Sequence, residues 1–169
     1  YVLSASNKKN KKYEGKSLTQ IAEAEKTDPF DVAVKLTIEG RGNVTALYIG
    51  VTGDLQHEKY LQFLLKHGLS AACLDALLTG KGVPHPGGYG GFPRLLGRYT
   101  RQQRLFTLEE AVRKITSLPA NRILLDRRGI LREGAYADIT IFNPRTIVDR
   151  GTYLEPKHAP IGIEYVIVN

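Results

Sequence analysis

The chain has 169 residues, 42% of them hydrophobic, a composition that excludes a disordered or fibrous protein and could bury the core of one domain or parts of two. A single cysteine, Cys73, excludes an internal disulfide framework, and no stretch is long and apolar enough to span a bilayer, so we expect a cytoplasmic protein. The chain has no methionine and both its ends fall at predicted strands, so we expect it to be a piece of a larger protein.

The formal net charge of +7 comes substantially from one short basic stretch, SNKKNKKYEGK. Its lysines are Lys8, Lys9, Lys11, Lys12 and Lys16. A localised basic run of this kind is usually a solvated loop. No aromatic-rich sheet motif, helix-turn-helix pattern or zinc finger accompanies it, so we consider nucleic acid an unlikely partner.

The first elements are a strand and two helices. YVLSAS at 1–6 has the character of a strand, and SLTQ at 17–20 has the spacing of a capping box, which predicts a helix start. Asp28 followed by Pro29 repeats the pattern of an N-cap and a first helical residue. Apolar residues then recur at helical spacing, so this second helix should end near Gly40.

The next section alternates between strand and helix. VTALYIGV at 44–51 predicts a strand buried on both faces, 54–67 a helix with Gly68 as its C-cap, and 69–74 a second buried strand. Such alternation favours a parallel α/β arrangement, in which function gathers at the carboxyl ends of the strands. Asp75 stands at one such end.

A further helix and a small β-module complete the chain. Thr107 and Glu110 form the pattern of a capping box, and Pro119 should end the helix that they begin. Beyond it, GILREGAYADITIFNP and IGIEYVIVN have the period of strands. We therefore divide the chain into an α/β part, 1–118, and a β-module, 119–169.

The passage from Asp75 to the glycines is the candidate site. A carboxylate at a strand end can cap the following turn, ligate a divalent metal, or accept a proton from a metal-bound water. His85, in a His-Pro step, can order a turn or ligate a metal, and the four histidines form no ligand cluster in the sequence. PHPGGYGGF at 84–92 lacks the lysine that ends a phosphate-binding loop, so we interpret it as a mobile or close-packed loop over the strand ends.

Two motifs in this passage resemble the N-acyl-D-amino-acid deacylases (D-aminoacylases) of the metal-dependent amidohydrolase superfamily. In that family a His-Pro precedes a Ser-Asp-Gly at the end of the eighth barrel strand, and His67-Gly68 and Leu74-Asp75-Ala76 occupy these places. HPGGYGGFPRLLGRY at 85–99 is similar to the family's His-Pro-Arg-x-Tyr-Gly-x-Phe-Pro signature and its leucine-glycine-arginine-tyrosine segment. The resemblance covers essentially the whole chain.

The resemblance implies an α/β fold in which this chain supplies the C-terminal part of a (β/α)8 TIM-type barrel and strands of a small β-sandwich. It implies hydrolysis of the amide of N-acyl-D-amino acids with zinc, most of whose ligands lie outside this chain. Asp75 would be the catalytic carboxylate and a metal ligand, and His85 and Tyr89 would bind substrate. The partner would be the N-terminal portion of the same enzyme or a complementary chain.

Three positions depart from the family pattern. Leu74 replaces a serine, Ala76 a glycine, and Gly87 the arginine after His-Pro. Two other interpretations therefore stay open: a cyclic amidohydrolase related to hydantoinases or dihydroorotases, and a non-catalytic scaffold subunit of an amidohydrolase-like complex.

Overall fold

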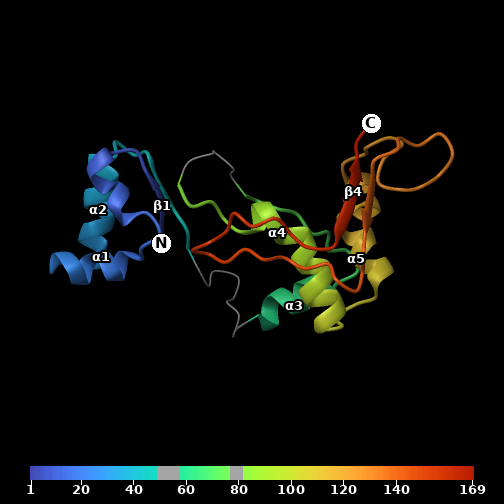
Figure 1. Ribbon diagram of the computed structural model, residues 1–169, viewed down its shortest axis with the longest axis horizontal. Helices are drawn as coiled ribbons and strands as arrows, with labels where there is room; N and C mark the ends of the chain where they lie inside the picture. The colour runs from blue at the N-terminus through green and yellow to red at the C-terminus, as the bar shows by residue number, and fades with distance from the viewer. Residues whose placement is uncertain (49–57, 77–81) are drawn as a thin grey trace.

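A computed structural model describes residues 1–48, 58–76 and 82–169. Its N-terminal part, drawn in blue in Figure 1, lies at one end of an elongated molecule and contains two strands, a 3-10 helix and two α-helices. In chain order they are β1 (Val2–Ala5), η1 (Lys8–Tyr13), α1 (Leu18–Glu25), α2 (Pro29–Glu39) and β2 (Val44–Ala46).

Both predicted helix starts are confirmed. The Ser17 hydroxyl accepts from the Gln20 amide at 3.0 Å and the Gln20 side chain accepts from the Ser17 amide at 2.9 Å, which completes the capping box of α1. The Asp28 carboxylate accepts from the Phe30 amide at 2.7 Å and begins α2. Each cap satisfies amides that have no partner within the helix.

The lysine-rich stretch is a 3-10 helix and not the loop that we expected. One face of η1 buries Asn10 and Tyr13 while its lysines face outward. The side-chain amide of Asn10 also donates to the Glu39 carboxylate at 2.7 Å, at the end of α2. Two inward-facing side chains thus give the basic run a regular structure.

The strands β1 and β2 form an antiparallel pair, with Ala5 opposite Val44. The expectation of a strand buried on both faces is wrong for Val44–Ala46, which is partly to fully exposed, and 49–51 lie outside the described residues. The pair covers a core with α1 and α2. Its buried members are Val2, Ala5, Tyr13, Ile21, Ala22, Val32 and Leu36.

The rest of the chain contains five further helices and two strands within 58–76 and 82–169. The helices are α3 (Lys59–Lys66), α4 (Gly87–Arg94), the π-helix η2 (Leu95–Gln102), α5 (Leu108–Ile115) and α6 (Ser117–Arg122). The strands are β3 (Ile139–Phe142) and β4 (Ile163–Ile167).

Helix α3 covers the second half of the predicted helix, since 54–57 lie outside the described residues. It ends at Lys66, and because His67 leaves the helix with an extended backbone, the expected C-cap role of Gly68 is wrong. Two of its large apolar side chains are exposed, Tyr60 at 70% and Leu64 at 56%, whereas Leu61 and Leu65 are half-buried.

The predicted strand at 69–74 is not formed. Leu69 is 67% exposed and Leu74 is 42% exposed, and the segment has irregular backbone. A strand needs a neighbour for its amides and carbonyls, and among the described residues no strand lies beside this segment. Both described sheets are antiparallel pairs, β1 with β2 and β3 with β4.

The glycine-rich passage is a helix and not a loop. Helix α4 contains four glycines and continues into the π-helix η2. Pro93 explains the change of helix type, because its ring lacks an N–H and crowds the carbonyl one turn earlier, and a wider turn relieves that contact. The Thr100 hydroxyl donates to the Leu95 carbonyl at 2.8 Å within the wide turn.

Helix α5 begins as predicted, with the Thr107 hydroxyl accepting from the Glu110 amide at 3.2 Å. It ends at Ile115, and Pro119 lies inside α6, so the expectation that Pro119 ends the helix is wrong. The proline is tolerated there because it falls in the first turn of α6, where amides have no helical partner.

Beyond α6, the two predicted strand segments form strands over only part of their length. Strands β3 and β4 pair with Ile139 opposite Ile167, whereas 129–138 form turns and not a strand. Ile147 lies between the two strands in sequence and is buried with Leu96 and Ala111, which joins this part to η2 and α5. Within the described residues no helix has the length and apolar character to cross a membrane.

Candidate active site

Asp75 lies in an exposed, irregular segment that two neighbours hold in place. The Ala72 amide donates to the Lys114 carbonyl of α5 at 3.0 Å. On the other side Leu74 packs on Gly91 of α4, so closely that a Cβ added there would lie 2.2 Å from the Leu74 side chain. Asp75 is therefore placed between α4 and α5 by contacts of the residues just before it.

His85 precedes α4 and is partly buried. Its Nδ1 accepts from the Gly87 amide at 3.0 Å, and its ring meets the edge of Tyr153 with centroids 5.8 Å apart. Burial lowers the pKa of His85 below its ordinary 6.5. A neutral ring whose Nδ1 accepts carries its proton on Nε2, which makes His85 a hydrogen-bond donor at that atom.

A cavity of about 310 Å³ lies between α4 and the chain around 149–153. It brings together a histidine, two arginines, an aspartate and a tyrosine. These lining residues are His85, Arg94, Arg98, Asp149 and Tyr153. Of the predicted site residues only His85 is among them; Asp75 and Tyr89 are not in the part of the lining that the structure describes.

Glycine in α4 lets the helix approach the other wall of this cavity closely. A Cβ at Gly90 would lie 2.7 Å from that of Asp149, so only glycine admits this approach. Arg94, one turn further along α4, pairs with Asp149 at 2.9 Å. Close contact with Asp149 thus explains why glycine stands at position 90 in spite of its poor helix propensity.

Glu58 fixes the far side of α4 and η2. It is only 7% exposed, and its carboxylate accepts from Arg98 at 3.0 Å and from the Tyr99 hydroxyl at 2.8 Å. Burial alone would raise the pKa of Glu58, but these two hydrogen bonds outweigh it and lower the pKa, so the carboxylate stays ionised. Its charge compensates that of Arg98.

This arrangement can bind a small polar group beside His85, with the imidazole Nε2 as donor and Arg94 as a cation already offset by Asp149. The sequence did not identify Glu58, Arg94 or Asp149 as members. Arg94 lies inside a motif that the sequence contains, but Glu58 is 40 residues from Arg98 and Asp149 is 55 residues from Arg94. No local pattern signals such distant pairs.

The described residues do not by themselves fit a zinc ion. Protein zinc sites use three or four nitrogen, sulfur or oxygen ligands. Across 1–48, 58–76 and 82–169, no group of three histidine, cysteine, aspartate or glutamate side chains is close enough to hold a metal. Asp75 can offer one carboxylate only.

Comparison with known proteins shows which family the chain resembles. The model of the amidohydrolase family matches residues 63–169. The chain is 37% identical over 155 residues to an N-acyl-D-glutamate deacylase and 36% identical over 155 residues to a D-aminoacylase, both from Alcaligenes xylosoxydans xylosoxydans. Each alignment covers 92% of this chain and 30% of the relative, so the chain spans less than a third of the relatives' length.

Solved structures agree over almost the whole chain. The N-acyl-D-glutamate deacylase of Bordetella bronchiseptica, complexed with zinc and a phosphonate inhibitor that mimics the tetrahedral intermediate, matches with a TM-score of 0.87 and 34% identity. A D-aminoacylase crystal structure matches with a TM-score of 0.86 and 33% identity. Both cover 99% of this chain and 32% of the other. The chain belongs to the amidohydrolase family, and its resemblance to the N-acyl-D-amino-acid deacylases is confirmed.

Proposed function

We propose that this chain is the C-terminal portion of a zinc-dependent amidohydrolase that hydrolyses the amide bond of N-acyl-D-amino acids. In this proposal 1–118 complete a (β/α)8 barrel and 119–169 contribute strands to a β-sandwich. Most zinc ligands come from outside the chain, from the N-terminal portion of the same enzyme or from a complementary chain.

One observation carries the proposal: 99% of the chain superimposes, with a TM-score of 0.87, on a deacylase that binds zinc and a mimic of the tetrahedral intermediate. An identity of 34% over that length makes shared chemistry the expectation and not only a shared fold. The irregular, exposed segment before Asp75 also supports it, because a barrel strand forms its hydrogen-bond ladder only when neighbouring strands are present.

Three residues have assigned roles in this proposal. Asp75 is the catalytic carboxylate and one metal ligand. It takes a proton from the water whose oxygen bonds to the amide carbon, and gives that proton to the amine nitrogen as the C–N bond breaks. His85 and Tyr89 bind substrate. The donor at His85 Nε2, held by the Gly87 amide on the other nitrogen, suits a carbonyl or carboxylate oxygen of the substrate.

A substrate panel tests the proposal on the full-length enzyme. N-acetyl-D-amino acids, their L-enantiomers and hydantoins are assayed side by side, with zinc content measured on the same preparation. Release of acetate from the D-substrates, with stoichiometric zinc, supports the proposal. Turnover of hydantoins alone would favour the cyclic amidohydrolase alternative.

A non-catalytic scaffold is the second candidate, and the departures from the family pattern favour it. Leu74 stands where the family has a serine and packs on Gly91, and Gly87 offers no side chain where the family has an arginine. A full-length protein that contains no zinc and turns over none of these substrates would support the scaffold.

A further inference from the structure

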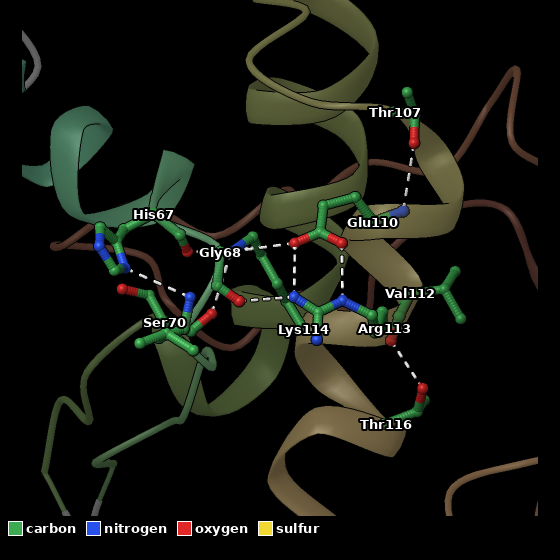
Figure 2. Close-up of polar contacts among 10 residues, drawn as sticks. His67, Gly68, Ser70, Thr107, Glu110, Val112, Arg113, Lys114 and Thr116 are labelled. Atoms are coloured by element: carbon green, nitrogen blue, oxygen red, sulfur yellow. Dashed lines mark hydrogen bonds and ion pairs between the residues drawn. The ribbon is translucent and has the colours of Figure 1, made fainter.

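Lys114 is completely buried in α5, although lysine is almost never buried without partners. Its Nζ donates to the carbonyl of His67 at 2.7 Å and to that of Ser70 at 3.1 Å, and it lies 3.3 Å from a carboxylate oxygen of Glu110. An ammonium group has three N–H donors. All three therefore have an acceptor, and two of these acceptors belong to the loop after α3 (Figure 2).

The same turn of α5 holds this loop at further points. Arg113 donates to the Gly68 carbonyl at 2.6 Å, and the Lys114 carbonyl accepts from the Ala72 amide at 3.0 Å. Figure 2 shows both cationic side chains reaching from the helix towards the loop. Two consecutive residues thus fasten the backbone at four positions between 67 and 72, three residues before Asp75.

The surroundings of Lys114 argue against direct chemistry. Lys114 does not line the His85 cavity, and its donors are all engaged within the chain. Both acceptors in the loop are backbone carbonyls, so these contacts depend on the path of the main chain and not on the loop side chains. This is the arrangement expected of a group that sets where a segment runs.

We infer that Lys114 is a positioning residue, which holds the 67–72 backbone on α5 and so sets the place of Asp75. This inference rests on the proposed function of Asp75. It adds a residue that touches neither substrate nor metal and acts through the backbone that it binds.

The test uses the full-length enzyme with Lys114→Met, which keeps most of the length of the side chain but removes its charge and three donors. Hydrogen exchange is measured on peptides covering 67–76 and, for comparison, 18–39. We expect faster exchange in 67–76 only, because the carbonyls of His67 and Ser70 lose the Nζ donor that holds this backbone on α5. We also expect kcat to fall on the order of 10-fold to 100-fold with KM nearly unchanged, as for a misplaced catalytic group.

Leu36→Ala is the control for lost stability. Leu36 is 2% exposed in the N-terminal core, so the variant is destabilised without a change near the loop. It should keep kcat when measured well below its unfolding temperature. In an Asp75→Asn background, Lys114→Met should still speed exchange in 67–76 but no longer lower the residual kcat, because its effect on kcat passes through Asp75.

The outcomes separate the inference from the proposed function. Full activity in Asp75→Asn would overturn the proposed function. An inactive Asp75→Asn together with unchanged exchange in Lys114→Met, or an equal loss of kcat in Leu36→Ala, would overturn the inference alone. If Lys114→Met does not fold, Arg113→Gln replaces it. Within the loop this side chain holds only Gly68, although it also pairs with Glu110, so its loss should give the same pattern with smaller changes in exchange and kcat.

Discussion

Leu74 rests directly on Gly91, so the residue before Asp75 is seated on the helix that lines the His85 cavity. The contact has no room for a methyl group, since a Cβ at Gly91 would lie 2.2 Å from the Leu74 side chain. This connects two motifs that are separated by eight residues of sequence, 77–84, of which 77–81 lie outside the described residues. It also gives the substitution of leucine for the family's serine a physical role.

Gly91→Ala should therefore change activity more than stability. Alanine favours the helix by about 1 kcal/mol over glycine, which offsets most of the cost of the crowded Leu74. Displacement of Leu74 should shift Asp75 and lower kcat/KM of the full-length enzyme on the order of tenfold. Urea unfolding and steady-state kinetics measure the two effects.

The double variant Leu74→Ala with Gly91→Ala is the matched control, because removal of the leucine side chain makes room for the new methyl group. It should recover part of the lost kcat/KM. No recovery, or a Gly91→Ala enzyme as active as the original, would show that this contact does not set the place of Asp75.

The elements that the sequence predicted are those whose signals are local. The caps at Ser17, Asp28 and Thr107 each use a side chain and an amide two or three residues away, so a short window contains the whole interaction. The prediction of a strand at 69–74 was wrong because a strand depends on neighbouring strands, which lie far away in sequence or outside the described residues.

Helix α4 failed for a different reason. Its four glycines have poor helix propensity, so the passage was predicted as a loop. What makes glycine suitable is the approach of Asp149 to Gly90 and of Leu74 to Gly91, which are tertiary contacts. The cavity could be predicted only in part for the same reason. His85 lies in a recognisable sequence motif, but the acidic partners of Arg94 and Arg98 are distant in sequence and come close only in the folded chain.

Acid should weaken the fold through Glu110. Its hydrogen bond from Arg113, helped by Lys114 and opposed by burial, lowers its pKa from 4.5 to about 2. A carboxylate whose pKa is lower in the folded state stabilises the fold above pH 4.5, and this stabilisation is lost as the pH falls towards 2. Because the side chain is partly exposed, we expect about 1 kcal/mol.

The comparison of wild type with Glu110→Gln isolates this effect. Free energies of unfolding by urea at about pH 6 and pH 3 should show the variant less sensitive to acid by that amount. Equal slopes with pH in the two proteins would contradict the assignment.

His85 should make the fold sensitive to mild acid. Burial lowers the pKa of His85 below 6.5, so the unfolded chain binds the proton more readily than the folded one. Stability is therefore lost as the pH falls below about 6.5. His85→Gln should remove that loss in urea unfolding; a variant with the same pH dependence as wild type would refute it.

Ile147 should be a stability residue. It is 1% exposed and joins the C-terminal part to Leu96 and Ala111, so Ile147→Ala should lower the free energy of unfolding by about 2–4 kcal/mol. Leu131→Ala, at a side chain that is 80% exposed, should change it by no more than about 0.5 kcal/mol. Similar losses in both variants would show that Ile147 does not belong to a buried core with Leu96 and Ala111.

The most direct test of the account is kcat of the full-length enzyme with Asp75→Asn, measured on N-acetyl-D-amino acids beside Asp126→Asn. Asp126 is an aspartate of the same charge whose side chain is 81% exposed and pairs with Arg127. Loss of a general acid-base group predicts a fall in kcat on the order of 100-fold or more for Asp75→Asn and none for Asp126→Asn. Equal activity in the two variants would contradict the catalytic role of Asp75.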